Sequence, residues 1–466
     1  MRSFMYALVF LATWTTHSPA SVTVRISLDP TTKHQTIHGF GASAAWWVNW
    51  FDRIDEGKQT QALDLLFTEA GADLDIIRVN IPSASGADVT NPKRRTPDIE
   101  TSPGVYDLSR DSKSLSVMKA AVDRGASTLV LFANSPPRRL TRNGRTSGGD
   151  GGGSNLAIGA EPEFATYLVD VAEAVRYRFG FDRVRLSPIN EPQWRWGEDD
   201  RRRWQEGTHY SPAEARSLIR AVVDEVSARD LADRIKLEVF DSGSWAATPT
   251  YAAEIWTDPV IKDSIGSIAI HSYWSSPENK RETRAWLDEH LPDLAVIQSE
   301  YCEMRGGHDP GMRSALHVAR VIHDDLVIGR ATEWVWWLGM SSSRFCDGLI
   351  HVWLNTEEKK LEVTRRLWAL AHWSRFVKPG WARINVSAST DRLRVSAFVS
   401  PDSRRLVCVI INESDASVAF SLEADGATRW SEVERFVTDR ARKLKPEKPS
   451  ATSAARSLTT VVLESG

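Results

Sequence analysis

The sequence predicts an α/β protein made of a (β/α)8 TIM barrel with a side β-sandwich domain. Over most of the 466 residues, short apolar segments rich in β-branched residues alternate with longer amphipathic segments, which is typical of parallel strands joined by helices. After Pro379-Gly380 the helical pattern stops, and short alternating strands separated by Asp, Ser and Gly follow. This length corresponds to about three average domains, but barrels are routinely larger than the average domain.

The barrel is expected to contain eight strands, each of them a short apolar segment. In chain order they are Thr36–Phe40, Asp75–Asn80, Thr128–Ala133, Arg183–Ile189, Lys236–Phe240, Ser267–His271, Ala295–Ser299 and Glu333–Leu338. Helices with apolar residues three and four positions apart are expected at Gln59–Ala70, Glu161–Phe179, Pro212–Arg229, Arg281–His290 and Arg313–Leu326, with the eighth at Lys360–Val377. Ser211 before Pro212 is a typical helix start, because Ser is a good N-cap and Pro suits the first helical position.

The predicted β-sandwich draws on both ends of the chain. Its strands are expected at Leu393–Val399, Arg405–Ile411, Ser417–Leu422 and Ser457–Leu463. The segment Val22–Leu28 also alternates, and we expect it to join the same domain. The expected layout is therefore an N-terminal strand of the β-sandwich in residues 21–35, the barrel in 36–378 and the C-terminal β-sandwich in 379–466.

An export signal is predicted at the N-terminus. Arg2 supplies a positive charge, Phe4 to Trp14 form a short apolar run, and Ser18-Pro19-Ala20 is a small-residue cleavage site. The apolar run is too short to cross a bilayer, and no other segment is long enough, so no membrane contact is expected. We therefore expect a signal peptide over residues 1–20 and a secreted, extracellular protein. A buried helix or strand is the alternative for this segment.

Composition and motifs exclude several classes of function. A net charge of −3 gives no reason to expect nucleic-acid binding, which depends on a positive surface. The glycine-rich stretch from Ser147 to Ser154 lacks the Lys and Ser/Thr of a phosphate loop, and no zincin or serine-hydrolase motif is present. We therefore expect no cofactor, no metal and a monomer. The 19 Trp residues are unusually many, and flat indole rings are natural platforms for sugars.

Two glutamates lie where a barrel places its chemistry, at the carboxyl ends of the strands. Glu191 directly follows the fourth expected strand, and Glu300 follows the seventh. Paired carboxyl groups across a cleft are the minimum apparatus of glycoside hydrolysis, in which one is a protonated acid and the other an ionised nucleophile or base. A solvated rim residue or a helix cap is the alternative for either one alone. Glu303, three residues after Glu300, is expected to have a loop role.

Other strand ends carry side chains that could support such a pair. Arg78 closes the second strand, and a buried Arg beside a carboxylate holds it ionised and oriented. Tyr273 follows the sixth strand and could donate to the nucleophile. His271 ends that strand and could bind a sugar hydroxyl, although a core histidine is an equal alternative. A structural ion pair inside the barrel is the alternative role for Arg78.

Tryptophans follow several of the expected strands and suggest a sugar-stacking cleft. The candidates are Trp46, Trp47, Trp194 and Trp337, with Trp196, Trp274 and Trp336 in similar positions. Plain packing is as good an explanation for any one of them. The basic cluster Arg201-Arg202-Arg203 is expected on a solvated loop, with binding of an acidic sugar as the alternative. Among the three cysteines, Cys302 and Cys346 could form a disulfide, or all three could be free buried thiols.

Taken in order, these motifs resemble glycoside hydrolase family 30, a family of retaining clan-A (β/α)8 enzymes. The resemblance is carried by Gln35-Thr-Ile-His-Gly-Phe-Gly-Ala42, the Arg78 strand, Asn190-Glu191-Pro192, His271-Ser-Tyr273, Ser299-Glu300-Tyr301 and Trp373-Ser-Arg-Phe-Val-Lys-Pro-Gly380. It implies Glu191 as the acid/base, Glu300 as the nucleophile and Asn190 as a contact to the sugar 2-hydroxyl. It also implies that Tyr273 and Arg78 position the nucleophile, and that a side β-sandwich is built from both chain ends.

The resemblance also bears on the substrate, a polysaccharide or oligosaccharide. The segments Phe40-Gly-Ala-Ser-Ala-Ala-Trp46-Trp47 and Ala133-Asn-Ser-Pro-Pro137 are most similar to the endo-β-1,6-galactanase-like branch of the family. A xylanase or a β-1,6-glucanase of the same family is the main alternative. A non-catalytic carbohydrate-binding protein on the same barrel is the alternative of a different class.

Overall fold

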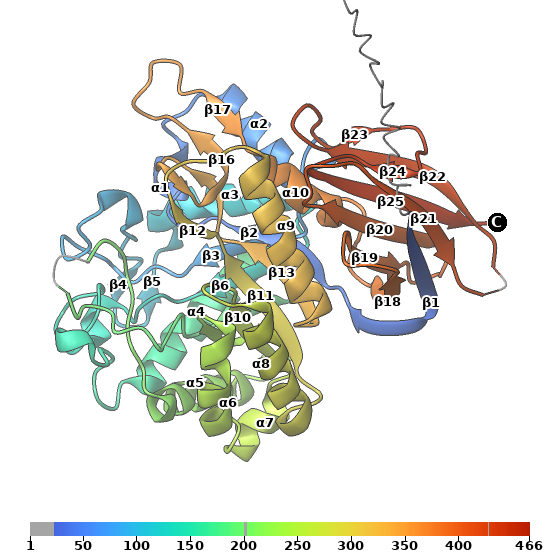
Figure 1. Cartoon of the computed structure of the whole chain (residues 1–466). Coiled ribbons are helices and arrows are strands. Elements are labelled where there is room, and N and C mark those ends of the chain that lie inside the picture. The colour runs from blue at the N-terminus through green and yellow to red at the C-terminus, as the bar shows by residue number, and fades with distance from the viewer. Residues whose placement is uncertain (1–22, 200–202, 427) are drawn as a thin grey trace, which may run out of the picture.

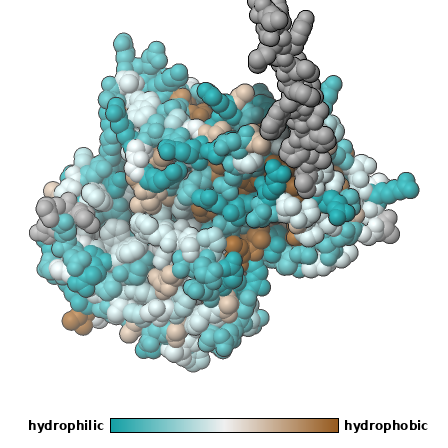
Figure 2. Space-filling model, viewed as in Figure 1, coloured by the Kyte–Doolittle hydropathy of each residue, from teal (hydrophilic) through white to brown (hydrophobic). Residues whose placement is uncertain are grey.

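The computed structural model describes residues 23–199, 203–426 and 428–466, and they form a barrel with a β-sandwich at its side (Figure 1). The segment expected to be a signal peptide lies outside the described residues, as do Arg201 and Arg202 of the basic cluster. The face shown in Figure 2 is largely hydrophilic, with small and scattered hydrophobic patches. Among the described residues, no helix combines the length and the apolar character that a membrane crossing requires.

Parallel strands form the barrel, which confirms the predicted fold class. They are β2 (Gly39–Ser43), β3 (Ile76–Asn80), β6 (Thr128–Phe132), β7 (Val184–Ser187), β8 (Ile235–Leu237), β9 (Val239–Ser242), β10 (Ser267–His271), β11 (Ala295–Tyr301) and β13 (Ala331–Trp336). Their order in the sheet is β8-β7-β6-β3-β2-β13-β11-β10-β9. The ring closes because β8 and β9 are two halves of the fifth strand, interrupted at Glu238. The amide of Glu191 donates to the Asp241 carbonyl (2.7 Å), which ties the end of β9 to the segment after β7.

Helices surround the strands on the outside of the barrel (Figure 1). They are α1 (Val48–Phe51), α2 (Glu56–Phe67), α3 (Ser112–Val122), α4 (Glu161–Phe179), α5 (Pro212–Ala228), α6 (Thr248–Ile255), α7 (Pro259–Ser264), α8 (Pro277–His290), α9 (Met312–Val327) and α10 (Arg365–Ser374). The predicted cap of α5 is present, since the Ser211 hydroxyl accepts from the amide of Glu214 and the Glu214 side chain accepts from the amide of Ser211.

The fifth strand expected at Lys236–Phe240 is divided into β8 and β9, and among the other differences two elements begin several residues later than predicted. The first barrel strand begins at Gly39, not at Thr36, because Thr36 still pairs with Ala382 in the sandwich. The eighth helix begins at Arg365, not at Lys360, because Leu361–Val363 forms a strand, β17, against β16 (Gly348–Val352). In both places a pairing partner distant in the sequence takes residues that local pattern alone assigns elsewhere.

The sandwich contains the first and the last strands of the described chain. Its strands are β1 (Val24–Thr36), β18 (Ala382–Ala388), β19 (Arg394–Val399), β20 (Arg405–Asn412), β21 (Val418–Ala424), β22 (Trp430–Thr438), β23 (Lys445–Pro446), β24 (Thr452–Ser453) and β25 (Ser457–Ser465). β1 pairs antiparallel with β18 and parallel with β21, so the dark blue strand lies among the red strands in Figure 1. Along β19 and β20, successive side chains point to opposite faces of the sheet. One set packs inside the sandwich, and the other packs against the barrel.

Short strand pairings extend the rim of the barrel where its strands end. They are the antiparallel pairs β4 (Glu100–Ser102) with β5 (Val105–Tyr106) and β12 (Glu303–Gly306) with β15 (Phe345–Cys346), and a sheet in which β14 (Leu338–Ser341) pairs parallel with β16 and β16 antiparallel with β17. The last two groups follow β11 and β13. They therefore surround the end of the barrel at which Glu300 emerges.

Candidate active site

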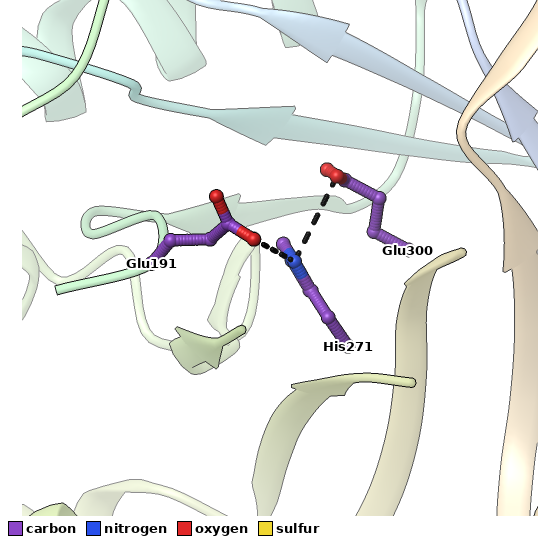
Figure 3. Close-up of side chains that lie close together, drawn as sticks. All are labelled: Glu191, His271 and Glu300. Carbon is purple, nitrogen blue, oxygen red and sulfur yellow. Dashed lines mark hydrogen bonds and ion pairs between the residues drawn. The ribbon is translucent and has the colours of Figure 1, made fainter. Parts of the chain in front are cut away.

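Glu191 and Glu300 face each other at the carboxyl ends of the barrel strands (Figure 3). Glu191 follows β7, and Glu300 lies near the end of β11. One carboxylate oxygen of each, together with a ring nitrogen of His271, lie within 4.8 Å of one another. Both glutamates are largely buried, with 8% and 4% of their surfaces exposed. The structure therefore brings together the two carboxyl groups that the sequence placed on separate strands.

Arg78 and Tyr273 hold the Glu300 carboxylate from two sides. Arg78 Nη1 donates to Glu300 Oε2 (2.7 Å), and Tyr273 Oη donates to Glu300 Oε1 (2.9 Å). Arg78 Nη2 also donates to Asn190 Oδ1 (3.0 Å), which fixes the amide beside Glu191. The guanidinium lies over the Phe132 ring, 3.5 Å from its centroid, and is 1% exposed. These contacts restrict Glu300 to one orientation.

Asp241, at the end of β9, completes the buried charge network and was not predicted from the sequence. It accepts from Arg78 Nη2 (3.2 Å) and from the hydroxyls of Ser187 and Ser299. Burial alone would raise the pKa of Asp241, but Arg78 and His271 outweigh it and hold the pKa well below its usual range. Its place directly after the fifth expected strand was the signal that could have found it.

His271 connects the carboxyl groups. Its Nδ1 lies 3.1 Å from Glu191 Oε1 and 3.7 Å from Glu300 Oε1, and its Nε2 lies 3.6 Å from Asp241 Oδ1. Burial opposes the charged imidazole, but the charge of Glu300 and the contacts with Asp241 and Glu191 prevail and raise the pKa of His271 to about 10. At neutral pH this histidine is therefore an imidazolium.

Burial also acts on Glu300 itself. It raises the pKa of the Glu300 carboxyl above its usual range, although the charges of His271 and Arg78 act in the opposite direction. The negative charge of Glu191 adds to the rise, because two carboxylates this close repel each other. The network thus has three carboxyl groups and two cations, and it is neutral when one of the carboxyl groups keeps its proton.

The same network argues against a metal at this point. Glu191, His271 and Glu300 converge closely enough to ligate an ion. Both oxygens of Glu300 already accept hydrogen bonds from Arg78 and Tyr273, however, and the Arg78 guanidinium already supplies a positive charge there. The donor set therefore fits a hydrogen-bonded carboxyl pair better than a cation site.

A cleft of about 630 Å³ opens above this network, and six tryptophans line it. They are Trp46, Trp194, Trp196, Trp204, Trp274 and Trp337. Trp47 is placed elsewhere: it is 1% exposed, packs edge-on against Phe51 and donates to the Ser43 carbonyl (2.9 Å). Three of the four tryptophan candidates therefore line the cleft, as do Trp196 and Trp274, which the sequence placed in similar positions. Trp204 was not predicted from the sequence, and it is 49% exposed, against 65% for Trp274.

Several cleft residues have left-handed backbone conformations, which non-glycine residues rarely adopt. The φ angles are 66° at Trp46, 49° at Glu191 and 49° at Trp274. Such conformations cluster at functional sites because the surrounding fold over-determines them. Here each turns a side chain toward the cleft directly after a barrel strand.

Glu303 and the cysteines lie outside the carboxyl network. Glu303 begins β12 rather than lying in a loop; it is 1% exposed and accepts from Ser314 Oγ and from Arg305. All three cysteines are free and buried, so no disulfide forms between Cys302 and Cys346. Cys302 Sγ lies 3.7 Å from Tyr273 Oη, whereas Cys346 Sγ lies 3.6 Å from the Gly307 carbonyl.

A TIM barrel with paired carboxyl groups beneath a tryptophan-lined cleft defines a class of carbohydrate-active (β/α)8 proteins. Residues 22–351 match the family model for O-glycosyl hydrolase family 30, and residues 382–461 match that for the glycosyl hydrolase family 30 β-sandwich domain. The chain therefore belongs to glycoside hydrolase family 30. The family resemblance of the sequence motifs is confirmed.

Relatives of the chain include glycanases of different specificity. The chain is 23% identical over 465 residues to an endo-β-1,6-galactanase of Hypocrea rufa, covering 92% of this chain and 91% of that one. It is 23% identical over 343 residues to a glucuronoxylanase of Bacillus subtilis, covering 72% and 71%. A solved structure of a conserved exported protein from Bacteroides fragilis has a TM-score of 0.83 at 25% identity, covering 94% of this chain and all (100%) of that one.

Proposed function

We propose that this protein is a retaining β-glycoside hydrolase in which Glu191 is the acid/base and Glu300 the nucleophile. The observation that carries the proposal is the approach of the two carboxyl groups to within 4.8 Å. Retaining glycosidases hold their carboxyl groups about 5–5.5 Å apart, whereas inverting enzymes need about 6.5–9.5 Å to admit a water molecule. The short separation supports direct attack by one carboxylate on the sugar.

Before the reaction, repulsion between the carboxylates keeps one proton on the pair. In the proposed roles the proton is assigned to Glu191, and Glu300 is the carboxylate, with the Arg78 cation and the Tyr273 hydroxyl as its hydrogen-bond donors. In the first step Glu300 attacks the anomeric carbon while the bond to the leaving oxygen breaks. Glu191 gives its proton to that oxygen.

The second step uses the charge change produced by the first. Once Glu300 is esterified, it no longer repels a negative charge on Glu191. The Glu191 carboxylate then takes a proton from water as the water attacks the anomeric carbon from the face that the leaving group occupied. The ester bond breaks, Glu300 leaves as a carboxylate, and its hydrogen bonds from Arg78 and Tyr273 reform.

The substrate proposed is β-1,6-galactan of arabinogalactan-type side chains. The similarity to an endo-β-1,6-galactanase along 92% of the chain supports it. A glucuronoxylanase shares the same level of identity over a shorter part, so xylan is the second candidate. We also propose that the protein is secreted, works as a monomer and needs no cofactor; the exported Bacteroides fragilis structure supports secretion.

The roles of the two glutamates can be assigned with azide. Glu300→Gly should almost abolish turnover of an activated aryl β-glycoside. Glu191→Ala should still form the glycosyl-enzyme but release it slowly, because no base activates water. Azide needs no base, so it should restore turnover of Glu191→Ala and give a β-glycosyl azide. With Glu300→Gly, azide should give the α-product, and NMR of the products distinguishes the two outcomes.

Glu303→Gln is the matched control, because Glu303 is a buried glutamate near Glu300 that lies outside the carboxyl network. It should keep near wild-type activity. If both Glu191→Ala and Glu300→Gly keep near-normal activity on a substrate that the wild type cleaves, they are not the catalytic pair. A wild type that binds but never hydrolyses sugars would indicate a carbohydrate-binding protein instead.

Product analysis identifies the substrate. The wild type should release short oligosaccharides from β-1,6-galactan faster than from β-1,4-xylan or β-1,6-glucan. Faster release from xylan would support the second candidate and contradict the galactanase proposal.

A further inference from the structure

The cleft has two tryptophan pairs on opposite sides of the barrel. Trp46 and Trp337 meet edge to face with ring centroids 4.9 Å apart, and Trp194 and Trp274 do so at 5.4 Å. Trp46 follows β2 and Trp337 follows β13, which are neighbours in the sheet. Trp194 and Trp274 follow β7 and β10, which flank the fifth strand, so this pair lies across the barrel from the first.

This arrangement distinguishes the side of the cleft that holds the leaving group from the side that holds the sugar attached to Glu300. In the proposed function Glu191 protonates the leaving oxygen, and Glu191 follows β7, on the side of Trp194. The leaving group therefore extends over the Trp194–Trp274 side. The sugar that becomes attached to Glu300 then points its far edge, around C4, toward the Trp46–Trp337 side.

Arg94 lies on that far side with most of its hydrogen-bonding capacity unused. Its guanidinium lies over the Trp46 ring, 3.9 Å from the centroid, and Nη1 donates to Gln205 Oε1 (3.0 Å). No carboxylate within the described part of the chain forms an ion pair with it. A guanidinium has five N–H donors, so most of them are available to a ligand in the cleft.

Asp347 supplies an acceptor on the same side of the cleft. It is 6% exposed, and Ser343 Oγ lies 3.0 Å from each of its carboxylate oxygens. Its main-chain carbonyl accepts from Trp336 Nε1 (2.7 Å), which fixes the loop after β15. Burial lowers the pKa of Arg94, and the negative charge of Asp347 acts in the opposite direction. Each carboxylate oxygen of Asp347 also retains a free lone pair.

We propose that Arg94 and Asp347 form a recognition pair for a free C4 hydroxyl on the sugar at the cleavage site, and that this pair selects β-1,6-linked over β-1,4-linked chains. A free hydroxyl can accept from Arg94 and donate to Asp347 at the same time. In a β-1,4-linked chain the C4 oxygen belongs to a glycosidic bond and has no hydrogen to donate. Asp347 would then face an acceptor, and a buried acceptor left unpaired is costly.

The test compares 4-nitrophenyl β-D-galactopyranoside with its 4-deoxy analogue. In the wild type, loss of the C4 hydroxyl should lower kcat/KM about tenfold or more. Arg94→Met and Asp347→Asn should each lower kcat/KM on the parent glycoside by a similar factor and lose the penalty for the deoxy analogue, as expected when the two changes remove one interaction. Both variants should also narrow the preference for β-1,6-galactan over β-1,4-xylan.

Arg195→Met is the control, because Arg195 lines the opposite side of the cleft and should keep the wild-type penalty for the deoxy analogue. An equal penalty in wild type and both variants overturns the proposal, as does a wild type that is indifferent to the C4 hydroxyl or cleaves neither glycoside. If the wild type prefers a β-glucuronide and Arg94→Met loses that preference, Arg94 binds a sugar carboxylate instead of a hydroxyl. That result also overturns the proposal. These outcomes are separate from the azide experiment, which tests the catalytic glutamates alone.

Discussion

Replacement of Arg78 by Met tests whether one buried cation organises the whole carboxyl network. Arg78 is 1% exposed and forms ion pairs with Glu300 (2.7 Å) and Asp241 (3.2 Å). Met keeps the aliphatic part of the side chain but removes the guanidinium that lies over Phe132, and so leaves both carboxylates without the Arg78 cation. Breaking a buried ion pair from one side costs about 3–5 kcal/mol. We expect a loss of this size in the free energy of unfolding, measured in urea at pH 7.

The same change should alter the pH dependence of activity. Burial already raises the pKa of Glu300, and a nearby opposite charge lowers a carboxyl pKa by about 1–3 units. Without Arg78, the pKa of Glu300 should rise further. Because the nucleophile works only as a carboxylate, activity is lost as pH falls through this pKa. The acidic limb of kcat/KM should therefore move upward by about 1–3 pH units.

A double variant separates stability from catalysis. Arg78→Met with Asp241→Asn removes the second uncompensated charge, so it should recover part of the lost stability while the acidic limb stays displaced. If Arg78→Met leaves the acidic limb of kcat/KM at its wild-type pH, that limb does not report the ionisation of Glu300. If the double variant is no more stable than Arg78→Met, repulsion and desolvation of Asp241 do not account for the loss.

Three further predictions concern other parts of the structure. Trp274→Ala removes a ring that is 65% exposed in the cleft, and the lost stacking should raise KM for the polysaccharide about tenfold, measured by reducing-sugar release. Asp325→Asn breaks its buried ion pair with Lys280 (2.7 Å) and should cost about 3–5 kcal/mol of unfolding free energy, whereas Asp224→Asn on the surface should cost less than about 1 kcal/mol. The pKa of His271 is raised to about 10, so its stabilising charge is fully present below about pH 6.5 and lost as pH rises toward 10. His271→Gln should therefore flatten the stability profile between pH 6.5 and 10, and an unchanged profile would contradict the imidazolium.

Local pattern was enough for the outline of the fold and for the two glutamates. Alternation of apolar segments and helices predicts parallel strands, and a closed parallel barrel necessarily gathers the carboxyl ends of all its strands at one face. Glu191 and Glu300 each directly follow an apolar strand, so their meeting follows from topology alone. The same rule would have found Asp241, which directly follows the fifth strand as expected at Lys236–Phe240 and lies near the end of β9.

Adjacent tryptophans show where local pattern fails. Trp46 lines the cleft and Trp47 is buried against Phe51, although they are neighbours in the same segment. The left-handed backbone at Trp46 (φ 66°) directs the two rings to different places. That conformation is unfavourable by itself, and it persists because Trp337 and Arg94, from distant parts of the chain, pack on the Trp46 ring.

The sequence by itself determined the barrel strands to within a few residues and their order along the chain, because hydrophobic periodicity and turn residues act over a few positions. Only the tertiary structure decided which charged side chains at the strand ends contact one another. Arg78 donates hydrogen bonds to Glu300, Asp241 and Asn190, and Arg94 and Asp347, far apart in the chain, line the same cleft. Burial makes such contacts strong, and burial is a property of the whole packed molecule rather than of any segment.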